Sequence, residues 1–495
     1  MIFETFKRMR EKRPFSPAFL VASGDRALPI PWKQFTDDID IVVHLIRTYA
    51  PGVKIGILGE NSYEWMVAHA ATVFSGAVAI PVDTNLTPQE ISERMKYTGA
   101  VALVHSSLYE ECARVAGELT PGLVVAGFGT LKTERFLDKL RSAFGLKDSI
   151  WRQERLELGE DSTGEPQTSM IVFTSGTTTR PRGAELTLKG MEACCEAWAK
   201  ALPMHPGDRS LMMLPLHHIF GVCTAYLMLV HGVALGVCPD FRRIYDDFER
   251  FRVDFAFLVP ALAEILAQKI QQRGSCAEEA FGKPIGWILT GGAALPRRVY
   301  EHLTSLGIRT LAAYGLTETS AMYAVTPLAD APRAGSQGRV SLMPGIESKV
   351  SQAGELLLKG PCVMKGYYRQ PERTAAVIDA DGWYHTGDLG SIDGDGYVWI
   401  TGRISRTIVL SSGKKIAPEE LEERLTALPG VKEAVVSGEG ESRDIRAEVY
   451  SVLSEELTRK IIGEFNLTMP VYKRIRTVTV RREPFPRTSS GKIKT

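Results

Sequence analysis

The chain has 495 residues, about three times the length of a typical single domain, so two or more domains are expected. Its 44% hydrophobic and 24% charged content is that of a globular protein and excludes fibrous and disordered classes. Lysine plus arginine (59) almost balances aspartate plus glutamate (58), and the formal net charge of +1 favours neither a nucleic-acid partner nor an anionic membrane.

The cysteines and the apolar runs predict a cytoplasmic protein. The seven cysteines form no C-x-x-C pair and their number is odd, which is typical of reduced thiols. The first residues contain no apolar core of signal-peptide length. The longest apolar runs, 65–82 and 225–238, are broken by His, Ser and Gly and fall short of the about 20 mostly apolar residues of a membrane span. We expect buried core segments there and no integral membrane segment.

The first half of the chain alternates short apolar runs with helical patterns. Residues 53–82 have the order strand, turn, helix, strand of a βαβ unit. A helix is predicted over 88–95 with Thr87 as its N-cap, and a buried strand over 100–105. Further strand-like runs are 255–259, 285–290 and 310–314. This alternation predicts α/β architecture with parallel sheets, in which sites gather at the carboxyl ends of strands.

The pattern changes after about residue 335. Dense Gly, Asp and Pro there predict hairpins and a β-rich lobe. Mixed α/β character returns after residue 403, with a helix expected over 418–428 and a strand over 433–437. We therefore predict a large N-terminal domain, 1–403, with parallel-type α/β sheets and a β-rich lobe, and a small mobile α+β C-terminal domain, 404–495.

Residues 171–183, IVFTSGTTTRPRG, form an apolar strand that runs into a Ser/Thr/Gly loop with two arginines. Hydroxyls and backbone N–H groups can surround phosphate oxygens, and a guanidinium adds bidentate bonds. The loop lacks the Walker pattern. Taken alone, an ordinary polar turn is an equally good interpretation.

The loop resembles the phosphate-binding signature SGTTGxPKG of the adenylate-forming superfamily, which includes acyl-CoA synthetases, luciferases and adenylation domains. The other family motifs follow in order: LPLHHIFG (214–221), TGGAAL (290–295), YGLTE (314–318), YHTGDLG (384–390), GRISRTIVLSSGKKIAPEELE (402–422) and PRTSSGKIK (486–494). The resemblance covers essentially the whole chain, which is most similar to an AMP-forming acyl-CoA synthetase.

The resemblance implies roles for individual residues in binding ATP and Mg²⁺. Thr317 would contact phosphate, and Glu318 would hold Mg²⁺, an ion that prefers hard oxygen ligands. Tyr314 would lie on the adenine, and Asp388 would accept the ribose hydroxyls, although TGD alone favours an Asx turn in a hairpin. The implied nucleotide-binding residues are Thr174, Ser175, Gly176, Thr177, Thr178, Arg182, Gly292, Ala293, Tyr314, Gly315, Asp388 and Arg403.

Three further parts of the site follow from the same resemblance. His218 would lie near the reacting carboxylate, although a lone histidine is more often a satisfied core or surface residue. Lys492 would neutralise charge that develops at the α-phosphate, a contact worth about 3–4 kcal/mol in a dry site. Phe220 and residues 291–293 would border the acyl pocket.

The implied activity is ligation of a carboxylic acid to a thiol through an acyl adenylate. A fatty or aryl acid is expected, because Gly221 follows Phe220 where amino-acid activators place an Asp. Coenzyme A is the first acceptor hypothesis. An acyl carrier protein is the alternative, since residues 473–494 hold eight basic residues and one acid.

The chain departs from the family pattern at three positions. Thr179 and Arg182 replace the usual Gly and Lys of the phosphate loop, and Ser405 occupies the usual acidic or lysine position of the hinge. These departures motivate a hypothesis of another class, a non-catalytic nucleotide or acyl-adenylate binding protein.

Overall fold

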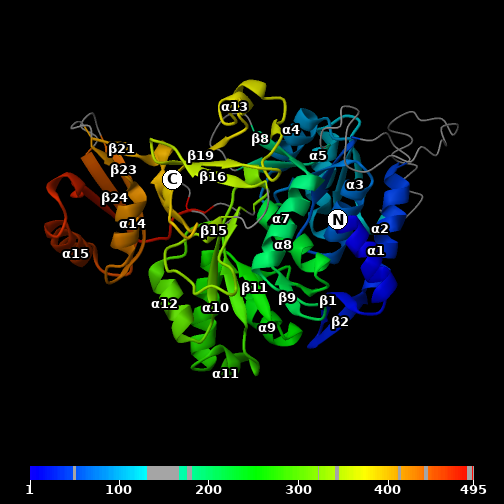
Figure 1. Ribbon diagram of the computed structural model, residues 1–495, viewed down its shortest axis with the longest axis horizontal. Helices are drawn as coiled ribbons and strands as arrows, with labels where there is room; N and C mark the ends of the chain where they lie inside the picture. The colour runs from blue at the N-terminus through cyan, green and yellow to red at the C-terminus, as the bar shows by residue number, and fades with distance from the viewer. Residues whose placement is uncertain are drawn as a thin grey trace.

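The computed structural model describes residues 1–47, 52–130, 167–174, 181–321, 323–340, 345–410, 414–439, 444–487 and 493. Figure 1 shows a large body and, at one end of it, a smaller unit that contains α14 and α15. Separate hydrophobic clusters underlie the two parts, and the cluster of the smaller unit draws its buried residues from Ile408 to Ile475.

A seven-stranded sheet forms the centre of the N-terminal half. In the middle of the sheet β4, β3, β5 and β6 run parallel, as the βαβ pattern predicts, and β7 pairs with β4 in parallel. The β7–β8 and β8–β18 pairs are antiparallel, which the alternation of elements did not indicate. The strands in spatial order are β18 (Gly366–Tyr367), β8 (Arg182–Thr187), β7 (Thr168–Thr174), β4 (Val78–Val82), β3 (Lys54–Leu58), β5 (Ala102–His105) and β6 (Val124–Gly127).

Two further sheets complete the α/β part. One has the parallel strands β11, β12 and β13, followed by antiparallel β14 and β15. Their bounds are β11 (Phe255–Leu258), β12 (Trp287–Thr290), β13 (Thr310–Tyr314), β14 (Ala324–Val325) and β15 (Arg339–Val340). The other has the order β2 (Arg26–Pro31), β1 (Pro17–Ser23), β10 (Ala234–Val237) and β9 (Arg209–Met212).

The predicted β-rich lobe is an antiparallel four-stranded sheet. Its strands are β16 (Glu347–Val350), β17 (Glu355–Lys359), β19 (Tyr384–Ile392) and β20 (Val398–Arg403). Asp388 therefore lies within a strand rather than in the Asx turn that TGD alone favours, and Gly387 has a positive φ of 70°. This register places Asp388 directly opposite Arg403 on β20.

Helices cover the sheets of the large body (Figure 1). α3 and α8 are apolar on almost every side and buried, which accounts for the two long apolar runs. The helices are α1 (Ile2–Lys12), α2 (Trp32–Arg47), α3 (Tyr63–Phe74), α4 (Pro88–Thr98), α5 (Glu110–Glu118), α7 (Leu188–Ala201), α8 (Ile219–Val230), α9 (Ile244–Phe251), α10 (Pro260–Arg273), α11 (Ala277–Phe281), α12 (Arg297–Ser305) and α13 (Pro371–Ala375).

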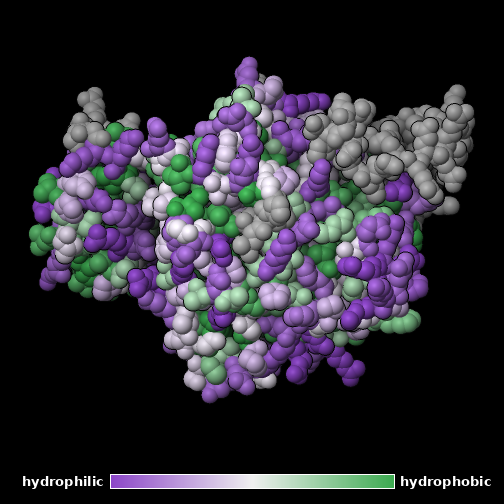
Figure 2. Space-filling model, in the orientation of Figure 1, coloured by the Kyte–Doolittle hydropathy of each residue, from purple (hydrophilic) through white to green (hydrophobic). Residues whose placement is uncertain are grey.

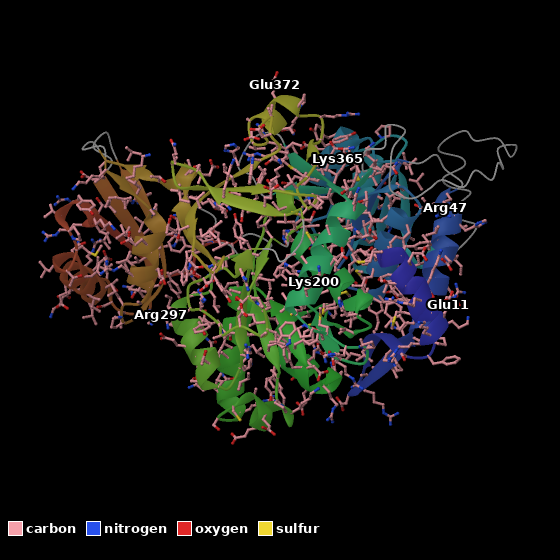
Figure 3. The ribbon with its side chains drawn as sticks, viewed as in Figure 1. Glu11, Arg47, Lys200, Arg297, Lys365 and Glu372 are labelled. Carbon is pink, nitrogen blue, oxygen red and sulfur yellow. The ribbon has the colours of Figure 1, made fainter. Side chains whose placement is uncertain are left out.

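The smaller unit has α+β structure. β23 and β24 are antiparallel, β25 joins β24 in parallel, and α14 packs on β23. On the large body, Arg297 of α12 pairs with Glu301 (Figure 3). The Glu301 carboxylate raises the pKa of Arg297, and Glu423 of α14 in the smaller unit raises it further. The elements are β21 (Ile408–Val409), β22 (Lys415–Ile416), α14 (Pro418–Thr426), β23 (Val431–Glu439), β24 (Asp444–Ser451), α15 (Glu455–Leu467) and β25 (Thr477–Arg481).

The cysteines and the helices can be compared with the expectations of reduced thiols and of no membrane segment. All seven cysteines are free thiols, and five of them are buried. Within the described ranges, no helix is both long and apolar enough to cross a membrane. Figure 2 shows hydrophilic and hydrophobic residues interspersed over the visible face rather than gathered in one apolar belt.

A single buried amide holds the segment that joins β9 to α8. The Asn61 side chain, 8% exposed, donates from Nδ2 to the carbonyls of Met212 (3.0 Å) and Leu214 (2.9 Å). Its Oδ1 accepts from the N–H of Leu216 at 3.0 Å. Asn61 follows β3, so these bonds fix the carboxyl end of β9 against the neighbouring sheet.

We expect Asn61→Ala to lower the free energy of unfolding by about 3 kcal/mol, because it leaves buried backbone groups without partners. Urea unfolding followed by tryptophan fluorescence measures this change. Gln89→Ala, on the exposed surface of α4, is the control and should change stability by less than about 0.5 kcal/mol. Equal stability of the two variants would contradict the positioning role of Asn61.

Candidate active site

The two ends of the predicted phosphate loop are described, whereas Ser175, Gly176, Thr177, Thr178 and Lys492 lie outside the described residues. Thr174 ends β7, Arg182 begins β8, and the two are cross-strand partners. The Nε of Arg182 is buried and has no hydrogen-bond partner among the described residues. A buried guanidinium donor without an acceptor is costly, so the position suits an anionic ligand.

Asp388 connects three predicted site residues. The Tyr314 hydroxyl donates to Asp388 Oδ2 at 2.6 Å, and Arg403 Nε lies 2.7 Å from Oδ1. Burial, and then the Asp388 charge, raise the pKa of Tyr314 well above its usual value, so its hydroxyl keeps the proton it donates. A carboxylate has about four lone-pair positions, so Asp388 can accept more hydrogen bonds than these two.

Glu318 lies directly beyond the end of β13. It belongs to a short 3₁₀ turn, Thr317–Thr319, and Ser320 and Ala321 follow with positive φ angles of 53° and 67°. Residues with a Cβ rarely adopt this left-handed backbone, and such strain gathers at functional sites. The Glu318 carbonyl accepts from the Met364 N–H at 2.8 Å, and its carboxylate Oε1 accepts from the Tyr367 hydroxyl at 2.8 Å.

Two tyrosines fill the space between Glu318 and Asp388. Burial raises the pKa of Tyr384, and the charge of Glu318 and the nearby Tyr367 and Tyr314 raise it further. Burial and then Glu318 also raise the pKa of Tyr367, while Arg182 lowers it. The ends of β8, β13 and β19 therefore converge on one polar, partly buried site with carboxylates at two points and arginines beside them.

Three predicted nucleotide-binding residues follow the carboxyl ends of β12 and β13, namely Gly292, Ala293 and Gly315. Thr290 of β12 pairs with Ala312 of β13, so residues 291–293 follow one strand just as Gly315 follows the other. Gly292 and Ala293 are exposed, and Gly292 has a φ of 81°. This arrangement agrees with the rule that sites in open α/β sheets lie at the carboxyl ends of parallel strands.

Phe220 and Gly291 meet beside this edge. A Cβ at Gly291 would lie 2.9 Å from the Phe220 ring, so only glycine allows the ring to approach this closely. Phe220 is on the first turn of α8, two residues after His218, the N-cap of that helix. The contact therefore brings the predicted acyl-pocket residues together and links them to the histidine segment.

His218 adjoins His217 and Asp83. The two imidazole ring centroids are 4.5 Å apart, and His217 Nε2 lies 3.5 Å from Asp83 Oδ1. Burial lowers the pKa of His217, which Asp83 raises and Arg94 lowers further. His217 is 8% exposed, whereas His218 and Asp83 are partly exposed, so this group opens towards solvent on one side.

Sequence reasoning missed Tyr367, Tyr384, Asp83 and Asn61 as parts of the site. Tyr384 stands in the motif YHTGDLG, and that motif is the signal that could identify it. Tyr367 reaches a carboxylate 49 positions away, and Asn61 bonds to backbone groups more than 150 positions away. No local pattern predicts such contacts, because they depend on which strands become neighbours.

The comparisons with known proteins identify the family of this chain. The AMP-binding enzyme family matches residues 17–368, and the C-terminal domain of AMP-binding enzymes matches residues 405–495. The chain belongs to the AMP-binding enzyme family. Its motifs and its fold are therefore those of the adenylate-forming enzymes that the sequence resembled.

Relatives in this family include coenzyme A ligases for different acids. The chain is 30% identical to 4-coumarate–CoA ligase 2 of Oryza sativa subsp. japonica, a match that covers 89% of this chain and 82% of the relative. It is 26% identical to the long-chain-fatty-acid–CoA ligase FadD13 of Mycobacterium tuberculosis, over 90% of this chain and 87% of the relative.

Solved structures share the fold. ATP-bound MatB from Rhodopseudomonas palustris superposes with a TM-score of 0.82 at 24% identity, covering 99% of this chain and 96% of that one. The AMP complex of O-succinylbenzoate coenzyme A synthetase from Bacillus subtilis has a TM-score of 0.80 at 22% identity, covering 99% and 96%. At these identities, the likeness shows the common fold.

We expect Tyr314→Phe to lower the free energy of unfolding by about 2 kcal/mol, because the buried Asp388 carboxylate loses a charged hydrogen bond. Urea denaturation measures the change. Tyr300→Phe, at a half-buried position on α12, is the matched control and should be close to neutral. A Tyr314→Phe protein as stable as this control would refute a structural role for the Tyr314–Asp388 bond.

Proposed function

We propose that the chain is an AMP-forming ligase that joins a fatty or aryl carboxylic acid to coenzyme A. The observation that carries this proposal is the convergence of Tyr314, Asp388 and Arg403, in direct contact, with Glu318 beside them. The membership of the AMP-binding enzyme family and the coenzyme A ligases among the relatives support it.

In the proposed site, this chain's residues hold the nucleotide. Tyr314 borders the adenine, Asp388 and Arg403 hold the ribose, and Thr174, Thr317 and Arg182 face the phosphates with the loop between β7 and β8. Glu318 is partly accessible and presents a carboxylate oxygen, and Mg²⁺ is usually held by one or two carboxylates together with phosphates. The ion would neutralise charge on the phosphate oxygens.

The proposed chemistry has two balanced steps. A carboxylate oxygen of the acid attacks the α-phosphorus of ATP, the bond to the bridging oxygen of the β-phosphate breaks, and pyrophosphate leaves. The sulfur of coenzyme A, having lost its proton, then attacks the acyl carbon, and AMP leaves with the electron pair of the broken C–O bond. His218 is placed beside the reacting carboxylate, and Phe220 and residues 291–293 line the acyl side.

We place the domain boundary at Arg403, and paired charges on each side support this position. Arg403 is bonded to Asp388 of the β-rich lobe. Arg406 binds Glu422 through both terminal nitrogens, at 2.5 and 3.1 Å, and Glu419 at 3.0 Å, both on α14. Ile404 and Ser405 lie between these anchors, and the family's C-terminal match begins at residue 405. A hinge at 404–405 lets the small domain rotate between the two steps.

An acyl carrier protein is the less favoured acceptor. The basic segment that suggested it is partly neutralised within the small unit, where Lys473 pairs with Glu420, Arg481 with Glu448 and Arg487 with Glu433. Paired side chains offer less charge to an acidic partner. The relatives described above are coenzyme A ligases.

The test is a panel of fatty and aryl acids assayed for ATP-dependent pyrophosphate release, followed by thioester formation with coenzyme A and with holo-acyl carrier protein. We expect release with at least one acid and transfer to coenzyme A. Transfer to the carrier protein alone would overturn the acceptor assignment. ATP binding without pyrophosphate release across the panel would favour the non-catalytic binding protein.

We expect Lys492→Ala to abolish pyrophosphate release from acid and ATP yet to spare thioester formation from synthetic acyl adenylate. The lysine would serve only the first step, where its charge is worth about 3–4 kcal/mol, or more than a hundredfold in rate. The control is Lys494→Ala in the same segment, which should retain both activities. Equal loss of the two activities in Lys492→Ala would remove this lysine from the first step.

We expect Tyr367→Phe to raise the Mg²⁺ concentration needed for half-maximal pyrophosphate release by about tenfold, because the hydroxyl orients the Glu318 carboxylate. A magnesium titration at saturating ATP and acid measures it. Tyr368→Phe removes the adjacent hydroxyl, which donates instead to the Thr98 carbonyl, and provides the matched control. An unchanged magnesium requirement in Tyr367→Phe would show that the bond does not position a metal ligand.

A further inference from the structure

Asp83, His217 and His218 form a compact group of metal-ligand side chains. One ligand atom of each residue lies within 4.8 Å of the others, and His217 Nε2 is 3.5 Å from Asp83 Oδ1. Asp83 directly follows β4, and the histidines precede α8, so two sheets contribute to the group. Two imidazoles and one carboxylate are a common donor set for transition metals.

His217 provides a second observation that points to a ligand. Its side chain is only 7% exposed, and no hydrogen-bond partner of its Nε2 is found in the part of the chain that the structure describes. Buried polar atoms of side chains are nearly always satisfied, so an orphaned ring nitrogen that faces a carboxylate calls for an additional group between them. A metal ion bound to Nε2 and to a carboxylate oxygen would satisfy it.

The surroundings hold the three side chains in place. Asp83 Oδ1 accepts from the backbone N–H of Asn85 at 2.9 Å and from its Nδ2 at 3.1 Å, the kind of outer support that metal-binding carboxylates receive. Asn61 fixes the backbone at 212–216 that leads into the histidines. Asp83 and His218 are partly exposed, the Asp83 side chain by 23%, which leaves a path for the ion.

One neighbouring charge opposes a metal ion. Arg94 lies over the Phe173 ring, 4.9 Å from the ring centroid, and is close enough to Asp83 and His217 to influence both. Its positive charge offsets the negative charge of Asp83 and weakens the attraction for any cation, so selectivity depends on the ligand atoms. Neutral imidazole nitrogens favour zinc over magnesium, and zinc needs only three protein ligands and a water.

We propose that Asp83, His217 and His218 bind one zinc ion, at a site distinct from Glu318. Binding requires neither ATP nor an acid, so it stands independently of the proposed ligase activity. A consequence that does rest on that activity is inhibition, because zinc on His218 withdraws the imidazole from the reacting carboxylate.

Zinc binding to the full chain is measured by competition with a zinc-sensitive dye in chelator-treated protein. We expect one ion per chain, with affinity weakened more than about tenfold in both Asp83→Asn and His217→Gln, since even outer-shell losses cost tenfold. Glu318→Gln, at the proposed magnesium position, should keep full affinity. His205→Gln removes an exposed histidine that lies 3.7 Å from Asp208 and controls for surface binding. Arg94→Met should tighten binding several-fold.

Cobalt substitution identifies the ligands by a second route. We expect visible ligand-field bands without the near-ultraviolet thiolate band that a cysteine ligand would add. Circular dichroism checks that each variant is folded, and if Asp83→Asn does not fold, His217→Gln and the cobalt spectrum decide. Absence of zinc binding, a thiolate band, or unchanged affinity in His217→Gln would overturn the site. Zinc that binds without inhibiting pyrophosphate release would support the site and contradict the role proposed for His218.

Discussion

The Asp388 carboxylate is 3% exposed, and a charge in such a position must be matched by donors from the protein. Tyr314 supplies one from the end of β13, and Arg403 supplies the other from β20. These donors belong to different sheets, so the buried charge fixes the β-rich lobe against the α/β body. The proposed nucleotide site lies beside these two contacts of Asp388. Glu318 follows β13 by only a few residues.

Under the proposed function, the same pairing defines where the chain would bend. Arg403 belongs to the large body through Asp388, whereas Arg406 belongs to the small unit through Glu419 and Glu422. Glu422 also accepts from the Val436 N–H at 2.8 Å, which ties the anchor into β23. Ser405 therefore replaces a charged side chain between the Arg403 and Arg406 ion pairs. Both ion pairs are present without that charge. A rotation about 404–405 breaks neither ion pair.

The features that follow from local sequence were predictable. Thr87 caps α4 as predicted, in a capping box with Glu90, and β3–α3–β4 matches the βαβ pattern. The antiparallel pairing of β8 with β7 was not predicted, because a buried strand has the same apolar pattern in either direction. Two side-chain contacts were also not predictable from the sequence, Tyr367–Glu318 and His217–Asp83. Each joins segments that only the folded sheets bring together. The roles assigned to the site residues, Lys492 included, stay predictions.

Under the proposed function, the charges around His218 orient the acid. Asp83 would repel a substrate carboxylate, but the nearby Arg94 offsets its charge, so the histidine face can accept an anion. On the other side, Phe220 packs on Gly291, and Val259 lies near Gly292, which makes that wall apolar. An acid therefore places its carboxylate towards His218 and its apolar part along Phe220. Zinc and the acid would then compete for the same imidazole, one as a cation balanced by Asp83 and the other as an anion balanced by Arg94.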